Sequence, residues 1–434
     1  MIQQTVRSRT KIKDVRIADI GINTQVLRSR TWDKLKLEVE YMQNRGTTSN
    51  SYLIKGDKVA LIDPPGQSFT HIYLEILSNH EWGKIDYIIL QHVNPNRLAT
   101  IKLIAGYAPQ AQIICSQPAA NALRGALMFP AWKSRVVVVK DKDTLDLGQG
   151  HKLQFISATT TRWLDGLCTY DSRSKILFTD KLFGTHLCGD SVFDDSSQQL
   201  DWEHHFYFDC LHASQTKQLT TILTKIKALE AEIYAPAHGF LTKHSLSQLM
   251  DNYCFWCKAQ NHRPSKVALL HVSAYGNTSK MSNAIALGLV QSGIAVESIN
   301  CESTSTAKII NTIQASDGFI IGLPTLNGQI SRQLQATLDV ILANIDRSKL
   351  VGLFGYDAWS GQALSVLESK LKNANYKFGF KPLRAEFGFD QTALQECIEA
   401  GKKFGQKLQK SEKLHVIRPA KNRYQASTTV DKAV

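Results

Sequence analysis

Short apolar runs bounded by polar residues dominate the first half of the chain. They read NSYLIKG, KVALID, KIDYIILQH, QIICS, RVVVVK, LQFISA, KILFTD and EIYAPAHG. Runs of this length, rich in β-branched residues, predict strands. The segments HIYLEILSNH and TKQLTTILTKIKALEA have helical patterns and lie between them. This half therefore predicts two sheets enclosed by helices, an αββα sandwich.

After the polar segment QNHRPSK, strands and helices alternate regularly. The strand-like runs are KVALLHVSAY, AVESIN, GFIIGLPT, LVGLFGYD and PLRAEFGF. Five strands joined by helical crossovers predict a doubly wound, five-stranded parallel sheet that binds its ligand beyond the carboxyl ends of the strands. We expect domains at residues 1–260 and 265–410, followed by a polar, aperiodic tail over 411–434.

Composition narrows the class of protein. The 434 residues exceed one ordinary core, and no apolar stretch approaches the roughly 18 residues that cross a bilayer. The opening MIQQTVRSRTKIKDVR lacks the apolar core of a secretory signal. We expect a cytoplasmic protein with no membrane span. The net charge is +13, but basic and acidic residues alternate, which favours an acidic protein or dinucleotide partner over nucleic acid.

Eight cysteines are scattered along the chain without the spacing of a disulfide framework. Cys254 and Cys257 form CFWC, a pattern found in redox and zinc half-sites. Because this segment looks helical and aromatic-rich and has no second pair, the pattern favours buried structural thiols.

Three loops at predicted strand ends indicate a flavin site. The first, SAYGNTSKMSNAIALGL from Ser273 to Leu289, leads from a strand into a helix with hydroxyl groups and free backbone N–H groups, which suits the phosphate of FMN. A capped turn without a ligand would look similar. GLPTLNG and GYDAWSG follow the third and fourth strands, and the second of these offers Tyr356 and Trp359 to a flat ring.

These loops resemble those of the flavodoxin fold. The resemblance implies that the phosphate is held by Ser273, Tyr275, Gly276, Asn277 and Thr278. It implies that the ribityl chain and isoalloxazine are surrounded by Pro324, Thr325, Leu326, Asn327, Gly355, Tyr356, Asp357, Trp359, Ser360 and Gly361.

The apolar strand DYIILQH delivers His92 into a loop that metallo-β-lactamase-like enzymes use to bind metal. Together with NSYLI, ALID, LFTDKLFG and APAHG, and with the flavodoxin-like half behind it, this segment resembles the flavodiiron proteins, which reduce dioxygen or nitric oxide. The resemblance covers nearly the whole chain.

The metal-ligand positions depart from that family. The family pattern has His-x-Glu-x-Asp-His in the first loop, a His before Trp, an Asp in LFxxDxFG and a His in P-x-HG. The matching residues here are His92, Asn94, Asn96, Arg97, Arg162, Lys181 and His238. Of the three carboxylates in the pattern, two are replaced by Asn94 and Asn96 and one by Lys181, while Arg97 and Arg162 replace two histidines. The formal charge changes from 3− to 3+, so we expect no metal there.

Several expectations follow for this pocket. We expect Arg97, Arg162 and Lys181 to converge and to hold water or a small anion such as chloride, unless Asp165 or Asp180 pairs with them. Since neighbours on a strand alternate, Asp180 should face away from the ligand position at Lys181. A site rebuilt from His186, His204 and His205 is a less favoured alternative.

Within the flavodiiron family, this chain resembles the class found in cyanobacteria and photosynthetic eukaryotes. Proteins of that class carry a further C-terminal flavin reductase domain, which would begin where this sequence ends. The resemblance implies an FMN-dependent electron-transfer subunit, paired in a homo- or heterodimer with a diiron-bearing paralogue and reducing oxygen to water with NAD(P)H as photoprotection. The sequence assigns no catalytic residue. A regulatory or assembly flavoprotein is the alternative, and a metallohydrolase is opposed by the missing ligands.

Overall fold

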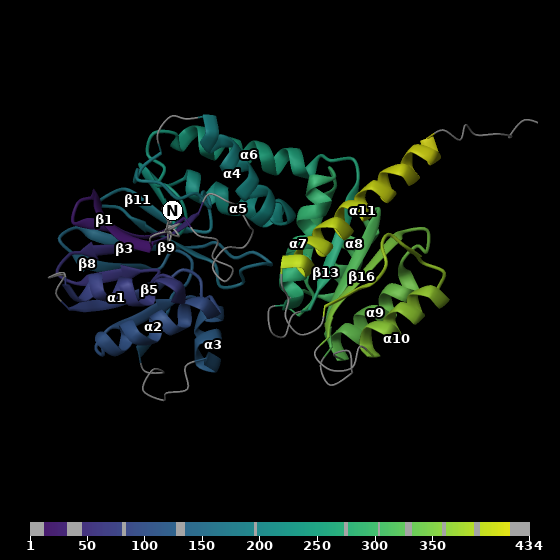
Figure 1. Cartoon of the computed structure of the whole chain (residues 1–434), viewed down its shortest axis with the longest axis horizontal. Coiled ribbons are helices and arrows are strands. Elements are labelled where there is room, and N and C mark those ends of the chain that lie inside the picture. The colour runs from purple at the N-terminus through teal and green to yellow at the C-terminus, as the bar shows by residue number, and fades with distance from the viewer. Residues whose placement is uncertain are drawn as a thin grey trace, which may run out of the picture. The chain divides into compact units, whose positions relative to one another are not determined.

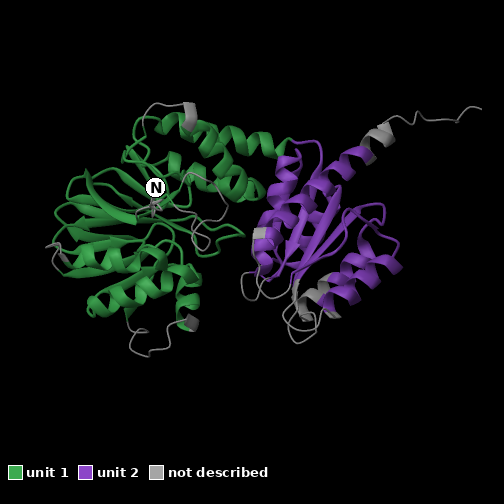
Figure 2. Cartoon of the chain, viewed as in Figure 1, with its two compact units in different colours: residues 1–262 green, residues 263–434 purple. Residues whose placement is uncertain are grey.

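The computed structural model describes residues 13–32, 46–79, 84–126, 135–194, 198–272, 277–302, 304–325, 332–357, 362–385 and 391–416. The chain divides into two compact units, residues 1–262 and 263–434 (Figure 2). Within the described ranges, no helix is both long and apolar enough to cross a membrane.

Two sheets form the centre of the first unit. The seven-stranded sheet has the order β1-β2-β3-β4-β5-β6-β7, antiparallel as far as β4 and parallel from β4 to β7. Its strands are β1 Lys13–Gly21, β2 Thr24–Thr31, β3 Thr47–Lys55, β4 Val59–Ile62, β5 Ile85–Leu90, β6 Gln112–Cys115 and β7 Val136–Val138. The five-stranded sheet has the order β12-β11-β10-β9-β8. Its strands are β8 Thr144–Gly148, β9 His151–Ser157, β10 Leu167–Asp171, β11 Ile176–Asp180 and β12 Ile233–Pro236.

Helices cover the outer faces of both sheets (Figure 1). Those beside the first sheet are α1 Thr70–Asn79, α2 Pro95–Tyr107 and α3 Gln117–Ala126. Those beside the second are α4 Gln198–Leu211, α5 Thr216–Lys227 and α6 Leu246–Asn261. Single 3₁₀ turns lie at Gln67–Phe69 and Ala213–Gln215. The predicted αββα sandwich is confirmed.

The core between the two sheets comes from inward-facing strand residues. Ile62 and Ile89 of the first sheet and Phe155 and Phe178 of the second are completely buried in one cluster. Each such side chain contributes about 1.5–3 kcal/mol through removal from water. This packing holds the ends of β5, β11 and β12 in fixed positions, and the candidate site lies just beyond those ends.

The second unit contains one parallel sheet in the order β14-β13-β15-β16-β17. Its strands are β13 Lys266–His271, β14 Ala295–Asn300, β15 Gly318–Thr325, β16 Leu350–Asp357, β17 Lys377–Phe378 and β18 Leu383–Ala385. Both β17 and β18 pair with β16, so two short strands share the fifth position. Pro382, which has no N–H to donate to a ladder, lies in the interruption.

Helices lie on both faces of this sheet. One face is covered by α8 Thr306–Gln314, α9 Arg332–Asn344 and α10 Gln362–Asn373, which share its apolar core. The other carries α7 Asn277–Gln291, packed against α11 Gln391–Val416 (Figure 1). This is the doubly wound, flavodoxin-like arrangement that the sequence predicts.

Candidate functional site

The former metal-ligand positions lie in loops at one end of the first unit. His92 follows β5, Lys181 follows β11, and His238 follows β12. Because β11 and β12 are parallel neighbours, their succeeding loops emerge side by side and bring Lys181 and His238 together. The remaining loop positions, Asn94 and Asn96, lead into α2.

Asn94 has a structural task at the start of α2. Its side-chain oxygen accepts a hydrogen bond of 3.0 Å from the backbone N–H of Asn96, and Pro95 occupies the first helical position. Asn as N-cap followed by Pro is a favoured helix start. This oxygen therefore caps the helix where the family pattern has a carboxylate.

The ammonium group of Lys181 lies beside the nitrogen of His238 that would otherwise bind a metal. The Nδ1 of His238 lies 2.7 Å from the carbonyl oxygen of Thr48, which can only accept, so Nδ1 carries the hydrogen. The Nε2 lone pair then points at Lys181 Nζ, 3.0 Å away. Both side chains are buried, at 4% and 5% exposure. The ammonium donates to the lone pair that a metal ion would otherwise take.

His92 keeps the orientation of a metal ligand. Its Nδ1 lies 2.8 Å from Oδ1 of Asp165, whose other oxygen accepts from the backbone N–H of Val93. Burial alone would raise the pKa of Asp165, but His92 and the Val93 N–H bring that pKa below its usual value. The ionised carboxylate accepts from Nδ1–H and fixes the ring, as carboxylates do behind metal-bound histidines.

Arg97 is enclosed by two acids. Its Nη1 lies 3.4 Å from Asp63 and 3.7 Å from Asp180, and all three side chains are buried. Burial raises the pKa of Asp63 to about 7, while Arg97 opposes that rise. Asp63 and Asp180 have φ of 52° and 45°, a left-handed conformation that is rare outside glycine.

This pairing corrects one expectation and confirms another. Asp180 was expected to face away from the pocket, yet it pairs with Arg97 and lines the same cavity as Lys181. Its positive φ and a register shift at the end of β11 break the alternation of the strand. The alternative that Asp180 supplies a counter-charge is confirmed, whereas Asp165 pairs with His92. Asp63 was not predicted, although it ends the conspicuous segment ALID.

Arg162 does not follow the prediction that three cations converge. Its Nη1 donates to the carbonyl oxygen of Cys210 at 2.9 Å, and its guanidinium lies 4.9 Å from the ring centre of Trp163. It is thus held against the end of α4. Arg97 and Lys181 remain as the pocket's cations, and Asp63 and Asp180 both lie beside Arg97, so the predicted net excess of positive charge is reduced.

The alternative of a rebuilt histidine site is not supported. The ring of His186 lies 4.8 Å from that of His238 and its Nδ1 contacts Thr47. His205 instead stacks on Trp256, and burial lowers the pKa of His204 to about 4. Across the ranges that the structure describes, no three His, Cys, Asp or Glu side chains are grouped so that they could hold a metal ion.

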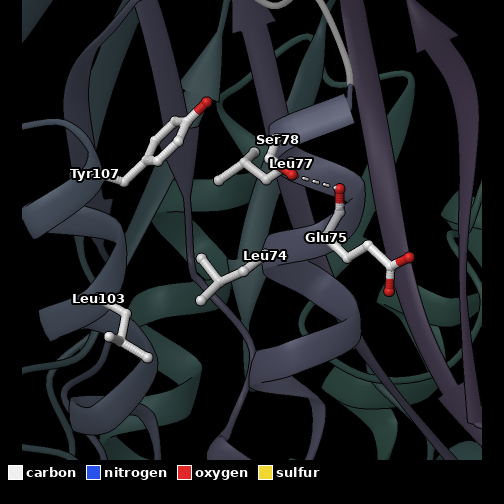
Figure 3. A pocket seen from close by; sticks show the side chains of 6 residues that line it. All are labelled: Leu74, Glu75, Leu77, Ser78, Leu103 and Tyr107. Carbon is white, nitrogen blue, oxygen red and sulfur yellow. Dashed lines mark hydrogen bonds between the residues drawn. The ribbon is translucent and has the colours of Figure 1, made fainter.

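Two cavities differ in character. One of about 20 Å³ lies beside Lys181, Asp180, Trp163 and His212 and has room for one water molecule. The expectation that water or an anion occupies the pocket stays a prediction. A groove of about 310 Å³ lies between α1 and α2 and is mainly apolar, with Leu74, Leu77, Leu103 and Tyr107 among its walls (Figure 3). Its polar lining residues are Glu75 and Ser78.

The predicted flavin loops emerge from adjacent strands of the second unit. β13, β15 and β16 are neighbours, with Pro324 opposite Tyr356 and Thr325 opposite Asp357, so their carboxyl ends form one edge. Asn277 and the buried Thr278 begin α7 at that edge. A Cβ on Gly355 would come within 2.9 Å of a backbone oxygen, so only glycine fits there unstrained.

Eight of the predicted flavin contacts lie outside the described residues: Ser273, Tyr275, Gly276, Leu326, Asn327, Trp359, Ser360 and Gly361. What the structure does describe fits FMN. A helix of 15 residues begins where the phosphate is expected, and two further strand ends lie on the same edge.

Comparisons with known proteins agree with this architecture. The ODP family beta lactamase pattern matches residues 47–239, and the NADPH-dependent FMN reductase pattern matches residues 265–393. A protein of Nostoc sp. strain PCC 7120 named diflavin flavoprotein A 4 is 52% identical over 415 residues, which are 95% of this chain and 72% of that relative. The chain belongs to the diflavin flavoprotein A family of flavodiiron proteins.

A second relative and a solved structure reinforce the family assignment. A Synechocystis sp. strain PCC 6803 protein, also named diflavin flavoprotein A 4, is 48% identical over 96% of this chain and 70% of the relative. The metal-soaked Flv1 flavodiiron core from Synechocystis sp. PCC6803 is 46% identical and superimposes with a TM-score of 0.88, covering 92% of this chain and 99% of that one. The predicted resemblance to cyanobacterial flavodiiron proteins is confirmed.

The residues of this flavodiiron chain do not fit two iron ions. Iron needs anionic oxygens and imidazole lone pairs that are free to coordinate. Here one such lone pair accepts from an ammonium, and the nearby carboxylates Asp63 and Asp180 face a guanidinium. No reaction step is derived through a metal at this site.

Proposed function

We propose that this flavodiiron chain is an FMN-dependent electron-transfer subunit of an oxygen-reducing system. Electrons originating from NAD(P)H pass through its flavin, and a paired flavodiiron paralogue with an intact metal centre reduces oxygen to water, protecting a photosynthetic cell. The observation that supports this division of labour most strongly is the 3.0 Å contact between Lys181 Nζ and His238 Nε2, in a unit that otherwise keeps the family fold.

The two units support different parts of the proposal. Bound FMN would supply one- and two-electron redox chemistry at its ring. The chain's own part is to hold the phosphate at the start of α7, where Thr278 is buried, and to shape the ring site with the ends of β15 and β16. In the first unit, Lys181 and Arg97 stand at two of the family's metal-ligand positions, where their contacts with His238 and Asp63 support the absence of a metal-based oxygen reaction in this chain.

The experiment compares the chain alone with a pair. The purified chain, supplied with NAD(P)H and a flavin reductase, should consume oxygen slowly and form peroxide, since reduced flavin without a metal centre yields partly reduced oxygen. Adding a paralogue with an intact His-x-Glu-x-Asp-His loop should raise the rate and shift the product to water. Rapid oxygen consumption without peroxide by the chain alone would show that a catalytic centre has been missed.

A double variant of the flavin site and a threonine control make the test specific. Thr278→Ala combined with Trp359→Ala should lower FMN content and remove the gain that pairing provides. Thr306→Ala, an exposed threonine at the start of α8, is the matched control and should keep both FMN and the gain.

The alternative is a regulatory or assembly flavoprotein whose FMN is structural. In that case the paralogue's activity would depend on the presence of this chain but not on its flavin. Stopped-flow mixing distinguishes the two functions, because a structural flavin, once reduced, would fail to reoxidise when the oxidised paralogue is added without oxygen.

A further inference from the structure

The two cysteines of CFWC face the seam between α5 and α6. These helices run side by side: at one end Lys227 of α5 lies 3.5 Å from Asp251 of α6, and at the other Thr216 donates a 2.7 Å hydrogen bond to Asn261. Along the seam, Cys254 forms a hydrogen bond with the ammonium group of Lys227, and Cys257 forms one with the side chain of Thr220. The paired thiols therefore share one helix face, three residues apart.

Their surroundings give the two thiols different access to solvent. Cys254 is partly exposed, while Cys257 is buried at 1% exposure. A thiolate is the reactive form of cysteine, and the ammonium of Lys227 lies within hydrogen-bond reach of the Cys254 sulfur. An accessible thiol beside an ammonium, with a second thiol one turn behind it, is the arrangement of an attacking and a resolving cysteine.

We propose that Cys254 and Cys257 form a peroxide-reactive pair, in which Cys254 is oxidised first and Cys257 then closes a disulfide. The Cys254 thiolate attacks one oxygen of hydrogen peroxide, the O–O bond breaks, and the departing hydroxide takes the thiol's proton to become water. The sulfur is left as a sulfenic acid. Cys257 then attacks that sulfur, the S–O bond breaks, and the proton of Cys257 leaves with hydroxide as a second water. Because burial raises the pKa of the Cys257 thiol to about 12, this closure is the slower of the two steps. Two thiols and one peroxide give one disulfide and two waters.

The helix makes this disulfide easily reversible. Side chains three apart on a helix have Cβ atoms about 5–6 Å apart, whereas a disulfide needs about 3.5–4.5 Å. Closing the bond must therefore distort one turn of α6, and a strained disulfide is readily reduced by dithiols. This inference does not depend on the proposed function, because any peroxide will serve as the oxidant.

The test uses the reduced full-length chain and hydrogen peroxide. Peptide mapping by mass spectrometry should show loss of two hydrogens in the segment containing both cysteines, restored by a dithiol. Cys257→Ala should stop the reaction at Cys254 sulfenic acid, which a dimedone probe traps. Lys227→Met, which keeps the length of the stem but not the charge, should slow oxidation of Cys254 roughly tenfold.

Cys188 provides an internal reference. It is also partly exposed, but burial raises the pKa of its thiol to about 11, so it should react slowly with peroxide. The proposal is overturned if Cys254 is modified no faster than Cys188, or if peroxide leaves the pair reduced in the wild-type chain. Because the wild-type measurement needs no substitution, the test stands even where the Cys257 variant folds poorly.

Discussion

Replacing Lys181 decides whether this first unit can hold a metal. Lys181 Nζ lies 3.0 Å from His238 Nε2, the nitrogen that would bind a metal. A divalent ion about 3 Å from a unit positive charge is repelled by about 11 kcal/mol at an effective dielectric of about 20. Structural zinc sites bind with roughly 10–16 kcal/mol in total. One ammonium in this place is therefore enough to offset most of the binding energy of a metal ion.

The perturbation returns the altered positions to the family's ligands. The five substitutions are N94E, N96D, R97H, R162H and K181D. The matched control carries the first four and retains Lys181. Because His92 and His238 keep their hydrogen-bonded orientation, the fivefold variant should regain metal, whereas the fourfold variant should not.

The assay is iron content after expression in iron-replete medium, supported by cobalt titration followed by absorbance. FMN content and thermal unfolding confirm that each variant is folded. We expect stoichiometric metal only in the fivefold variant. About two irons per wild-type chain, or equal metal in the fourfold and fivefold variants, would refute the reasoning from Lys181.

Three further predictions concern stability. The folded pKa of Asp63 is about 7 and its unfolded value is about 3.9, so the free energy of unfolding of the wild-type chain should decrease by up to about 4 kcal/mol as the pH rises from 4 to 7. Asp63→Asn should reduce this decrease when urea unfolding is compared at pH 5 and 7.5. An unchanged pH dependence in the variant would contradict the prediction. Phe178→Ala, which empties a fully buried position between the sheets, should cost about 3–5 kcal/mol in the same assay; a cost under about 1 kcal/mol would contradict the packing. Gly239→Ala should lower the melting temperature, because φ is 89° and the new Cβ would lie 2.1 Å from Oγ1 of Thr185; an unchanged temperature would contradict the strain.

The sheets were predictable because each strand carries its own signal. Runs such as DYIILQH and KVALLH are apolar, short and bounded by polar residues, so local pattern and buried position agree. The expectation that the flavin loops lie at one edge followed from the parallel sheet, because ligands of such sheets bind beyond the carboxyl ends of the strands. The division of the fifth strand into β17 and β18 was not predicted, although Pro382 could have indicated it.

The candidate site was predictable in its positions but not in its contacts. His92, Lys181 and His238 follow from motif register, since each lies just after a buried strand. Asp63 and Asp180 reach Arg97 only because both have a left-handed backbone, which no alternation rule provides. The direction of Arg162 depends on a carbonyl group 48 residues away in sequence, at the end of α4.

The contact between Lys181 and His238 changes what maturation of this unit requires. A protein stabilised by a bound metal gains free energy only in proportion to the logarithm of metal supply. The cation that faces His238 is instead the side chain of Lys181, so it is present in every chain that is made and does not depend on metal supply. The stability of this pocket should consequently not change when a chelator is added or when iron is scarce, and folding of the unit should not require a metal ion.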